Sequence, residues 1–156
     1  MDIDASFDEF QAEAVSAINA DFERKTTGRY LLVIPTGGGK TRTAVKSLCA
    51  LYDAGILSDE QDEVIWVAHR QELIQQAKKT LEEFVTATDT TAPIHKIHLL
   101  MISRISETIS RNRNIKLVVI DEAHHAAANS YQIIFQDDRF GVLGLTATPS
   151  RHDKKA

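Results

Sequence analysis

The sequence has one cysteine, no long apolar run and no strong excess of either charge, and each of these absences excludes a class of protein. Cys49 has no second cysteine with which to form an internal disulfide, so we expect the reducing environment of the cytoplasm. No apolar stretch approaches the roughly 18–20 residues that span a membrane, and the acidic start MDIDASFDEF lacks the layout of a secretory signal. The net charge of −4 argues against a protein that coats nucleic acid, although it permits a local basic groove.

The sequence does contain a glycine-rich stretch, LLVIPTGGGKTRT, at residues 31–43. The run LLVI has no polar alternation, which is typical of a buried strand in a parallel sheet. Three glycines then precede Lys40 and Thr41, and a helix is expected at residues 43–53. This order of strand, glycine-rich turn, Lys-Thr and helix is typical of a phosphate-binding P-loop. The strict pattern has a glycine where this chain has Ile34, and the alternative is a glycine-rich turn followed by a chance Lys-Thr pair.

Each part of this P-loop has a chemical role. The glycines Gly37, Gly38 and Gly39 allow backbone N–H groups to surround an anion, where a Cβ atom would crowd it. The following helix points its positive N-terminal end at the same place. Lys40 is predicted to reach the β- and γ-phosphates of a bound ligand, and the hydroxyl of Thr41 to ligate Mg²⁺.

Predicted strands and helices alternate along the chain, and 156 residues are enough for one domain with a sizeable core. The alternation predicts an α/β fold, with a mostly parallel sheet and helices on both faces. The ligand site of such a sheet lies beyond the carboxyl ends of its strands, and the segments PTGGGKT, HRQEL, DEAHH and TATP each follow a predicted strand. The expected strands are 31–34, 64–68, 94–102, 116–120 and 142–145. The expected helices are 7–22, 43–53, 69–85, 104–111 (capped by Ser103) and 129–135.

Two adjacent carboxylates, Asp121 and Glu122, follow the apolar strand KLVVI. An aspartate at a strand tip can hold Mg²⁺ opposite the P-loop hydroxyl, and a neighbouring glutamate can orient or deprotonate the attacking water. The alternative is a solvated acidic turn, which leaves the position opposite the P-loop unexplained. His124 and His125 lack the partner pattern of a zinc site, so a coupling role for His124 beside the acid pair is the preferred interpretation.

In this order and spacing, PTGGGKT, AHRQEL, DEAHHA and GLTATP resemble motifs I, Ia, II and III of superfamily-two helicases and translocases. The similarity is greatest to the branch that contains restriction-enzyme motor subunits and related DEAH-type DNA translocases, and it covers residues 7–151. The resemblance implies a RecA-like ATP-binding domain at residues 1–150, with residues 151–156 as a polar tail toward a second RecA-like domain. It also implies ATP and Mg²⁺ as cofactors and nucleic acid as partner, with DNA favoured over RNA.

The resemblance assigns roles on the nucleotide side of the domain. Gln11, preceded by Phe10, matches the adenine-recognising glutamine of the Q-type motif. Lys40 and Glu122 take the catalytic positions, beside the phosphate-binding glycines. A basic residue often found three positions before the motif glutamine is replaced here by Asp8, which implies weaker adenine contacts.

The resemblance also assigns roles on the nucleic-acid side. Three residues are expected to couple the nucleotide state to the bound strand: His124, Thr146 and Thr148. Arg70 is expected to face a phosphate of that strand, and Ser103 with Arg104 to take the place of the Ib/Ic element. The stretch between the Ia helix and DEAH is compressed, so a strand or the Ib loop is expected to be missing.

The expected function is that of the first motor domain of an ATP-dependent nucleic-acid helicase or translocase. The sequence contains no motifs IV to VI and no arginine finger, which contributes on the order of 10³–10⁵ in rate to related hydrolases. This chain alone is therefore expected to bind ATP with little hydrolysis, and to hydrolyse it to ADP and phosphate when a second domain completes the site. A free-standing, non-motor ATP-binding or interaction module is the alternative. A small-molecule kinase does not account for TATP or HRQEL.

Overall fold

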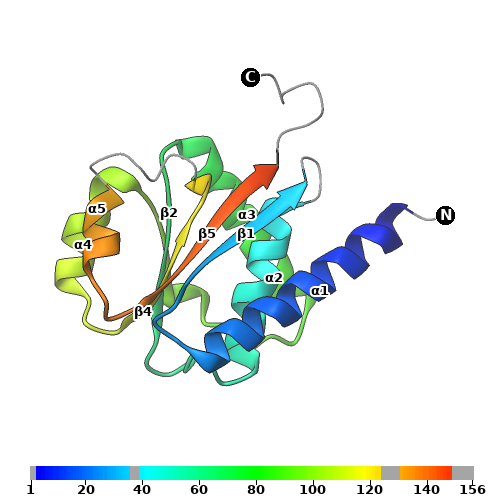
Figure 1. The fold of residues 1–156 in the computed structure, drawn as a ribbon, viewed down its shortest axis with the longest axis horizontal. Coiled ribbons are helices and arrows are strands. Elements are labelled where there is room, and N and C mark those ends of the chain that lie inside the picture. The colour runs from blue at the N-terminus through cyan, green and yellow to red at the C-terminus, as the bar shows by residue number, and fades with distance from the viewer. Residues whose placement is uncertain (1–2, 36–38, 124–130, 149–156) are drawn as a thin grey trace.

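The computed structural model describes residues 3–35, 39–123 and 131–148, and it contains one five-stranded sheet (Figure 1). All strand pairs are parallel, and the spatial order is β1-β5-β4-β2-β3, which confirms the expected α/β architecture. The strands are β1 (Arg29–Pro35), β2 (Glu63–Ala68), β3 (Ile97–Met101), β4 (Ile115–Ile120) and β5 (Gly141–Thr148). The helices are α1 (Ile3–Arg24), α2 (Lys40–Asp53), α3 (Gln71–Ala87), α4 (Ile105–Arg111) and α5 (Gln132–Gln136). Two short 3₁₀ turns, η1 (Ile94–Lys96) and η2 (Ile102–Arg104), flank β3.

Helices cover both faces of the sheet, as the sequence predicts. α1, α2 and α3 lie on one face, and α4 and α5 lie on the other (Figure 1). Successive strand residues point to opposite faces, so Trp66 of β2 packs under the first three helices while its neighbours Ile65 and Val67 pack under α4 and α5. The two apolar clusters are therefore separated by the sheet, and both are needed to bury the central strands.

Contacts between α1 and the start of the sheet fix the position of α1. The rings of Phe22 and Tyr30 pack edge to face with centroids 4.7 Å apart, and the Tyr30 hydroxyl donates a hydrogen bond to the carbonyl of Asp21 at 2.9 Å. At Gly141 an added Cβ would lie 2.4 Å from the carbonyl oxygen of Thr26. Glycine at this position therefore lets β5 begin directly beneath the turn that joins α1 to β1.

The helix after the glycine-rich turn begins earlier than predicted, at Lys40 rather than at residue 43. Gly39 precedes it with a left-handed backbone (φ 76°), a conformation that favours glycine. The Gly39 carbonyl accepts hydrogen bonds from the backbone N–H and from the hydroxyl of Thr43, each at 2.8 Å. These bonds start the helix at once, so Lys40 and Thr41 lie in its first turn.

The expectation that LLVI is buried on both sides is only partly correct. Ile34 is fully buried, but the side chains of Leu31 and Val33 are 60% and 44% exposed. β1 lies at the edge of the sheet, and the cluster beneath α4 and α5 is built on β2, β4 and the start of β5. This face of β1 therefore extends beyond the part of the sheet that the described helices cover.

The segment around the third strand differs from the predicted strand at 94–102. Residues Ile94–Lys96 form the turn η1 after Pro93, and β3 covers only Ile97–Met101. Ser103 does not cap the next helix as expected, because it lies inside η2 and α4 begins at Ile105 without a side-chain cap. A proline at the start and a 3₁₀ turn at the end thus shorten this edge strand.

The last strand is longer than predicted. β5 continues past Leu145 to Thr148, and its last three residues pair with residues 33–35 of β1. Because β1 itself extends to Pro35, it provides backbone partners that the sequence pattern does not reveal. α5 begins at Gln132, and residues 129–130 of the predicted helix lie outside the described part of the chain. In that described part, no helix is long and apolar enough to cross a membrane.

Candidate nucleotide site

The carboxyl ends of β1 and β4 bring the end of the P-loop next to the acid pair. Lys40 extends its ammonium group to 2.7 Å from Oδ1 of Asp121. The Asp121 side chain is fully buried, and its backbone N–H donates to the carbonyl of Val67 at 2.9 Å, which fixes it beside the end of β2. The side chain of Lys40 is 18% exposed, so the ion pair opens toward solvent only from the lysine side. Gly37 and Gly38 lie outside the described residues.

The residues at this point fit a magnesium ion. Oδ2 of Asp121 is buried and has no hydrogen-bond partner among the described residues, so it is a spare hard oxygen ligand. Thr41 lies in the first turn of α2 and is buried, which is consistent with a hydroxyl that ligates a metal at the start of this helix. The described part of the chain contains no group of three acidic, histidine or cysteine side chains that could hold a metal by itself. Mg²⁺ bound here would therefore take most of its remaining ligands from nucleotide phosphates and water.

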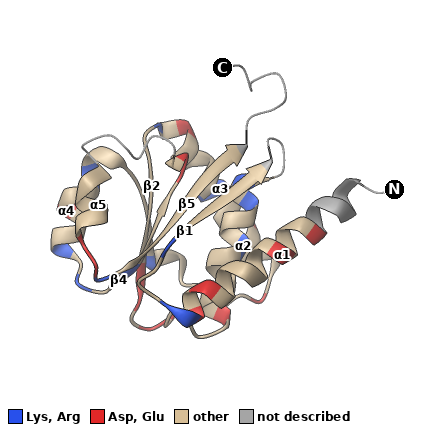
Figure 2. Cartoon of the chain, in the orientation of Figure 1, with Lys and Arg blue, Asp and Glu red and all other residues tan. Residues whose placement is uncertain are grey.

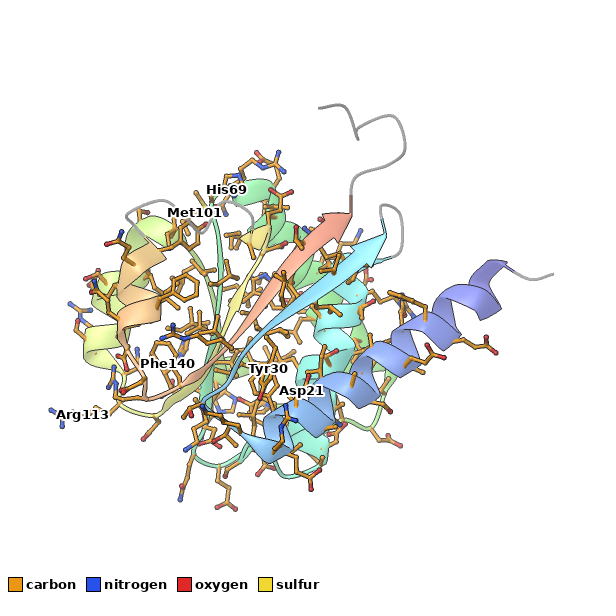
Figure 3. All side chains as sticks on the ribbon, in the orientation of Figure 1. Asp21, Tyr30, His69, Met101, Arg113 and Phe140 are labelled. Atoms are coloured by element: carbon orange, nitrogen blue, oxygen red, sulfur yellow. The ribbon has the colours of Figure 1, made fainter. Side chains whose placement is uncertain are left out.

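Glu122 has an unusual backbone and three basic side chains as neighbours. Its φ of 53° is left-handed, and it is the one residue other than glycine with positive φ in the described ranges. Its carboxylate lies 3.3 Å from the guanidinium of Arg70, 3.7 Å from Nε2 of His69 and 4.0 Å from Nζ of Lys40. His69 and Arg70 directly follow β2, so two of these three neighbours come from the end of that strand, where Figure 3 labels His69.

Gln11 of α1 also reaches this site. It is 3% exposed, and its Oε1 accepts a hydrogen bond from Nζ of Lys46 at 2.7 Å. Because an ammonium group only donates, this contact turns the Gln11 NH₂ group away from Lys46. A Cβ added at Gly39 would lie 2.7 Å from Nε2 of Gln11, so the amide lies directly over the end of the P-loop. The preceding residue, Phe10, is half-buried.

The residues expected on the nucleic-acid side are only partly gathered. Arg70 lies at the start of α3 with its side chain 53% exposed, and it contacts Glu122. Ser103 and Arg104 are exposed in η2, where Arg104 lines an open hollow of about 440 Å³ beside β3. Thr146 is half-buried in β5. His124 and the side chain of Thr148 lie outside what the structure describes.

Basic residues do not form a stripe over the described surface. Figure 2 shows Lys and Arg spread over several helices and loops, with acidic residues interspersed. Some of the arginines are engaged locally, such as Arg111 with Glu107 at 3.0 Å and Arg139 with Asp137 at 2.6 Å. Any contact with nucleic acid would therefore depend on a few placed residues rather than on a broad positive field.

The structure also places near the site residues that sequence reasoning missed. Tyr131 is 2% exposed, and burial, together with the negative charges of Asp121 and Glu122, raises the pKa of its hydroxyl. Lys46 is the partner of Gln11, and His69 is a neighbour of Glu122. None of the three belongs to a sequence pattern that predicts its contact, although the position of His69 immediately after a predicted strand could have indicated that it lies near the site.

Comparison with known proteins identifies the family of the chain. Residues 4–151 match the family model described as the type III restriction enzyme, res subunit. The chain is 27% identical to a putative ATP-dependent helicase, IRC3, of Saccharomyces cerevisiae over 95% of this chain and 24% of that protein. It is 30% identical to the type I restriction enzyme EcoAI endonuclease subunit of Escherichia coli, over 86% of this chain and 19% of that one. It is 29% identical to the DNA 3'-5' translocase XPB2 of Sulfurisphaera tokodaii, over 94% and 32% of the two chains.

The chain thus spans less than a third of the length of each of these three relatives. The family match covers nearly all of the chain, including both the P-loop and the acid pair. The parallel sheet flanked by helices on both faces agrees with the RecA-like fold that the sequence motifs imply. This chain belongs to the type III restriction enzyme res-subunit family, as an N-terminal domain of the superfamily-two helicase and translocase type.

Proposed function

We propose that this chain is the Mg²⁺-ATP-binding first motor domain of an ATP-dependent nucleic-acid translocase or helicase. The observation that carries the proposal is the 2.7 Å contact between Lys40 and the buried Asp121. A P-loop lysine and a strand-end aspartate are the two groups that bind a nucleotide triphosphate and its metal, and here they are adjacent. Residues 1–150 are proposed to form the ATP-binding domain, and Gln11 is proposed to recognise the adenine base.

The chemistry assigned to the site is hydrolysis of ATP to ADP and phosphate. Lys40 leaves Asp121 when a triphosphate binds and places its charge on the β- and γ-phosphates. Asp121 and Thr41 would hold the metal, which would neutralise charge that develops on the phosphate oxygens. Glu122 orients the attacking water and accepts its proton. Positioning and charge neutralisation supply most of the rate that this domain contributes.

A second RecA-like domain, in cis or in trans, is proposed to complete the site. It would supply an arginine finger opposite Lys40. In related hydrolases an arginine finger contributes on the order of 10³–10⁵ in rate. His124, Thr146 and Thr148 are proposed to carry the change of nucleotide state to the nucleic acid. DNA is the favoured partner, because the relatives include a restriction enzyme subunit and a protein named a DNA translocase. The single thiol, buried at Cys49, supports a cytoplasmic location.

The proposal is tested by titrating the chain with a non-hydrolysable ATP analogue and Mg²⁺ in a calorimeter. A charge-assisted hydrogen bond contributes about 1.5–3 kcal/mol, so Lys40→Ala is expected to weaken binding by at least ~10-fold. Lys78→Ala is the matched control, because Lys78 is an exposed lysine on α3. Equal affinity of the wild type and Lys40→Ala would exclude the P-loop as the nucleotide site.

A further inference from the structure

The carboxylate of Glu122 lies between the P-loop and the start of α3. Oε1 of Glu122 is 3.3 Å from the guanidinium of Arg70 and 4.0 Å from Nζ of Lys40, so one oxygen faces both cations. The other oxygen, Oε2, is 3.7 Å from Nε2 of His69. His69 lies at the same end of the sheet as Met101, where β2 and β3 finish (Figure 3). Glu122 is thus held from the side where the bound strand is expected, not only from the side of the nucleotide.

The backbone of Glu122 gives this contact a functional interest. Its left-handed φ of 53° is unfavourable for a residue with a Cβ atom, and glycine would remove that strain. A glycine would also remove the carboxylate. Strained backbones of this kind cluster at sites where the surrounding structure holds a side chain in a particular place. Here Arg70, His69 and Lys40 are among the groups of the described residues that lie within 4.0 Å of the side chain.

The two cations near Oε1, Lys40 and Arg70, are expected to behave differently when a nucleotide binds. Lys40 is 2.7 Å from Asp121 and belongs to the P-loop, so a bound triphosphate draws it away from the acid pair. Arg70 is outside the P-loop, and its side chain is 53% exposed. Its planar guanidinium is suited to a carboxylate or to a phosphate, but one face of it cannot serve both at once. With a nucleotide bound, Arg70 therefore remains the permanently charged group that lies beside Oε1.

We propose that Arg70 is a positioning residue for Glu122, and that a phosphate of bound nucleic acid competes with the Glu122 carboxylate for the Arg70 guanidinium. In the free domain, Arg70 holds Glu122 toward the end of β2. Nucleic acid takes Arg70 away, which weakens the hold on Glu122 and lets its carboxylate turn toward the attacking water. The inference rests on the proposed function, and it gives that function a physical link between strand binding and hydrolysis.

Reciprocity of coupled binding provides a test that does not depend on hydrolysis. If a phosphate and Glu122 compete for Arg70, removing the charge of Glu122 must strengthen nucleic-acid binding. The experiment measures the affinity of the chain for a short fluorescent single-stranded DNA at low salt, by anisotropy. The variants are Glu122→Gln, Arg70→Gln and the double variant, with Arg111→Gln on α4 as a matched arginine control. Circular dichroism checks that each variant is folded.

We expect Glu122→Gln to tighten DNA binding by about two- to fivefold when Arg70 is present, which is the range of partly exposed ion pairs. The same change in the Arg70→Gln background is expected to leave the affinity unaltered. Arg70→Lys keeps the charge and is expected to restore part of the difference, whereas Arg111→Gln should leave the effect of Glu122→Gln intact. Equal tightening in both backgrounds would show a general charge effect and overturn the proposal. Absence of tightening, or of DNA binding at low salt, would overturn it as well.

A spectroscopic measurement on the same chain supports or contradicts the contact directly. With ¹³C-labelled glutamate, the Glu122 carboxyl resonance is assigned from its loss in Glu122→Gln. We expect this resonance to move when DNA is added to the wild type, and to lie near the moved position in free Arg70→Gln. A resonance that is identical in wild type and Arg70→Gln would refute the positioning role. Failure of the ATP analogue to bind is read in a separate titration, so the two proposals fail in distinguishable ways.

Discussion

Replacing Lys40 with methionine leaves the buried carboxylate of Asp121 without its ammonium partner. At 2.7 Å, the attraction between the two charges is about 6 kcal/mol for an effective dielectric constant of ~20. The cost of taking a fully buried carboxylate out of water offsets much of this attraction. The intact pair therefore contributes little net stability, but the loss of one partner exposes the whole desolvation cost of the other. We expect Lys40→Met to lower the free energy of unfolding by about 3 kcal/mol.

The reverse change should be milder, because the burial of the two partners is unequal. The Lys40 side chain is 18% exposed and can turn toward solvent, whereas the Asp121 side chain is fully buried. Asp121→Asn is expected to cost about 1 kcal/mol, and the double variant Lys40→Met/Asp121→Asn to recover most of the stability lost in Lys40→Met. The double variant separates loss of the charge pair from loss of packing by the lysine stem.

The assay is urea unfolding followed by tryptophan fluorescence. Trp66 is the only tryptophan of the chain and is 1% exposed, so its emission reports opening of the core. Lys78→Met is the control for removal of a lysine, since Lys78 is exposed on α3. Equal midpoints for Lys40→Met and Lys78→Met, or a double variant no more stable than Lys40→Met, would refute the buried charge pair.

Three further predictions follow from individual contacts. Burial raises the pKa of Cys49 from 9.0 to about 11, so a thiol reagent at pH 8 should react only after urea unfolds the chain. Between pH 9.0 and about 11 the thiol loses its proton in the unfolded state before it does in the folded state, so the free energy of unfolding should fall as the pH rises. Gly141→Ala should lower the free energy of unfolding by about 1–3 kcal/mol in the urea assay, because its Cβ would meet the carbonyl of Thr26 at 2.4 Å; no loss would show that β5 can shift there. Lys46→Met removes the hydrogen bond that orients the amide of Gln11, so it should weaken ATP-analogue binding by about two- to tenfold in calorimetry. If Gln11→Ala left that affinity unchanged, an effect of Lys46 through Gln11 would be contradicted.

The architecture of the chain could largely be predicted from apolar runs and their punctuation. The run VIWVA and the apolar residues of KLVVI are buried on both faces because each lies inside the sheet, and their assignment as strands is confirmed. The same reasoning is wrong for one face of β1, because an apolar run does not say whether its strand lies at an edge. Strand order depends on long-range packing, which a local pattern does not contain.

The candidate site likewise combines residues that the sequence predicts with contacts that only the structure shows. The sequence predicts the roles of Lys40 and Asp121 from motif chemistry, and the structure brings the two residues together although their roles stay predictions. The partner of Gln11 was missed, because Lys46 lies 35 residues away with no pattern that links them. The contact between Arg70 and Glu122 spans 52 residues and runs against expectation, since the motif assigns that arginine to nucleic acid. Side-chain pairs between distant segments are decided by the packed fold.

The most direct test of the central claim is a titration of the ¹⁵N-labelled chain with a non-hydrolysable ATP analogue and Mg²⁺, followed by amide resonances. The claim is that one nucleotide binds where the P-loop faces the acid pair. We expect the amides of Gly39, Lys40, Thr41 and Asp121 to shift together with a single dissociation constant, and Lys40→Ala to raise that constant by at least ~10-fold. Shifts confined to other parts of the sheet, or an unchanged dissociation constant in Lys40→Ala, would contradict binding at this place.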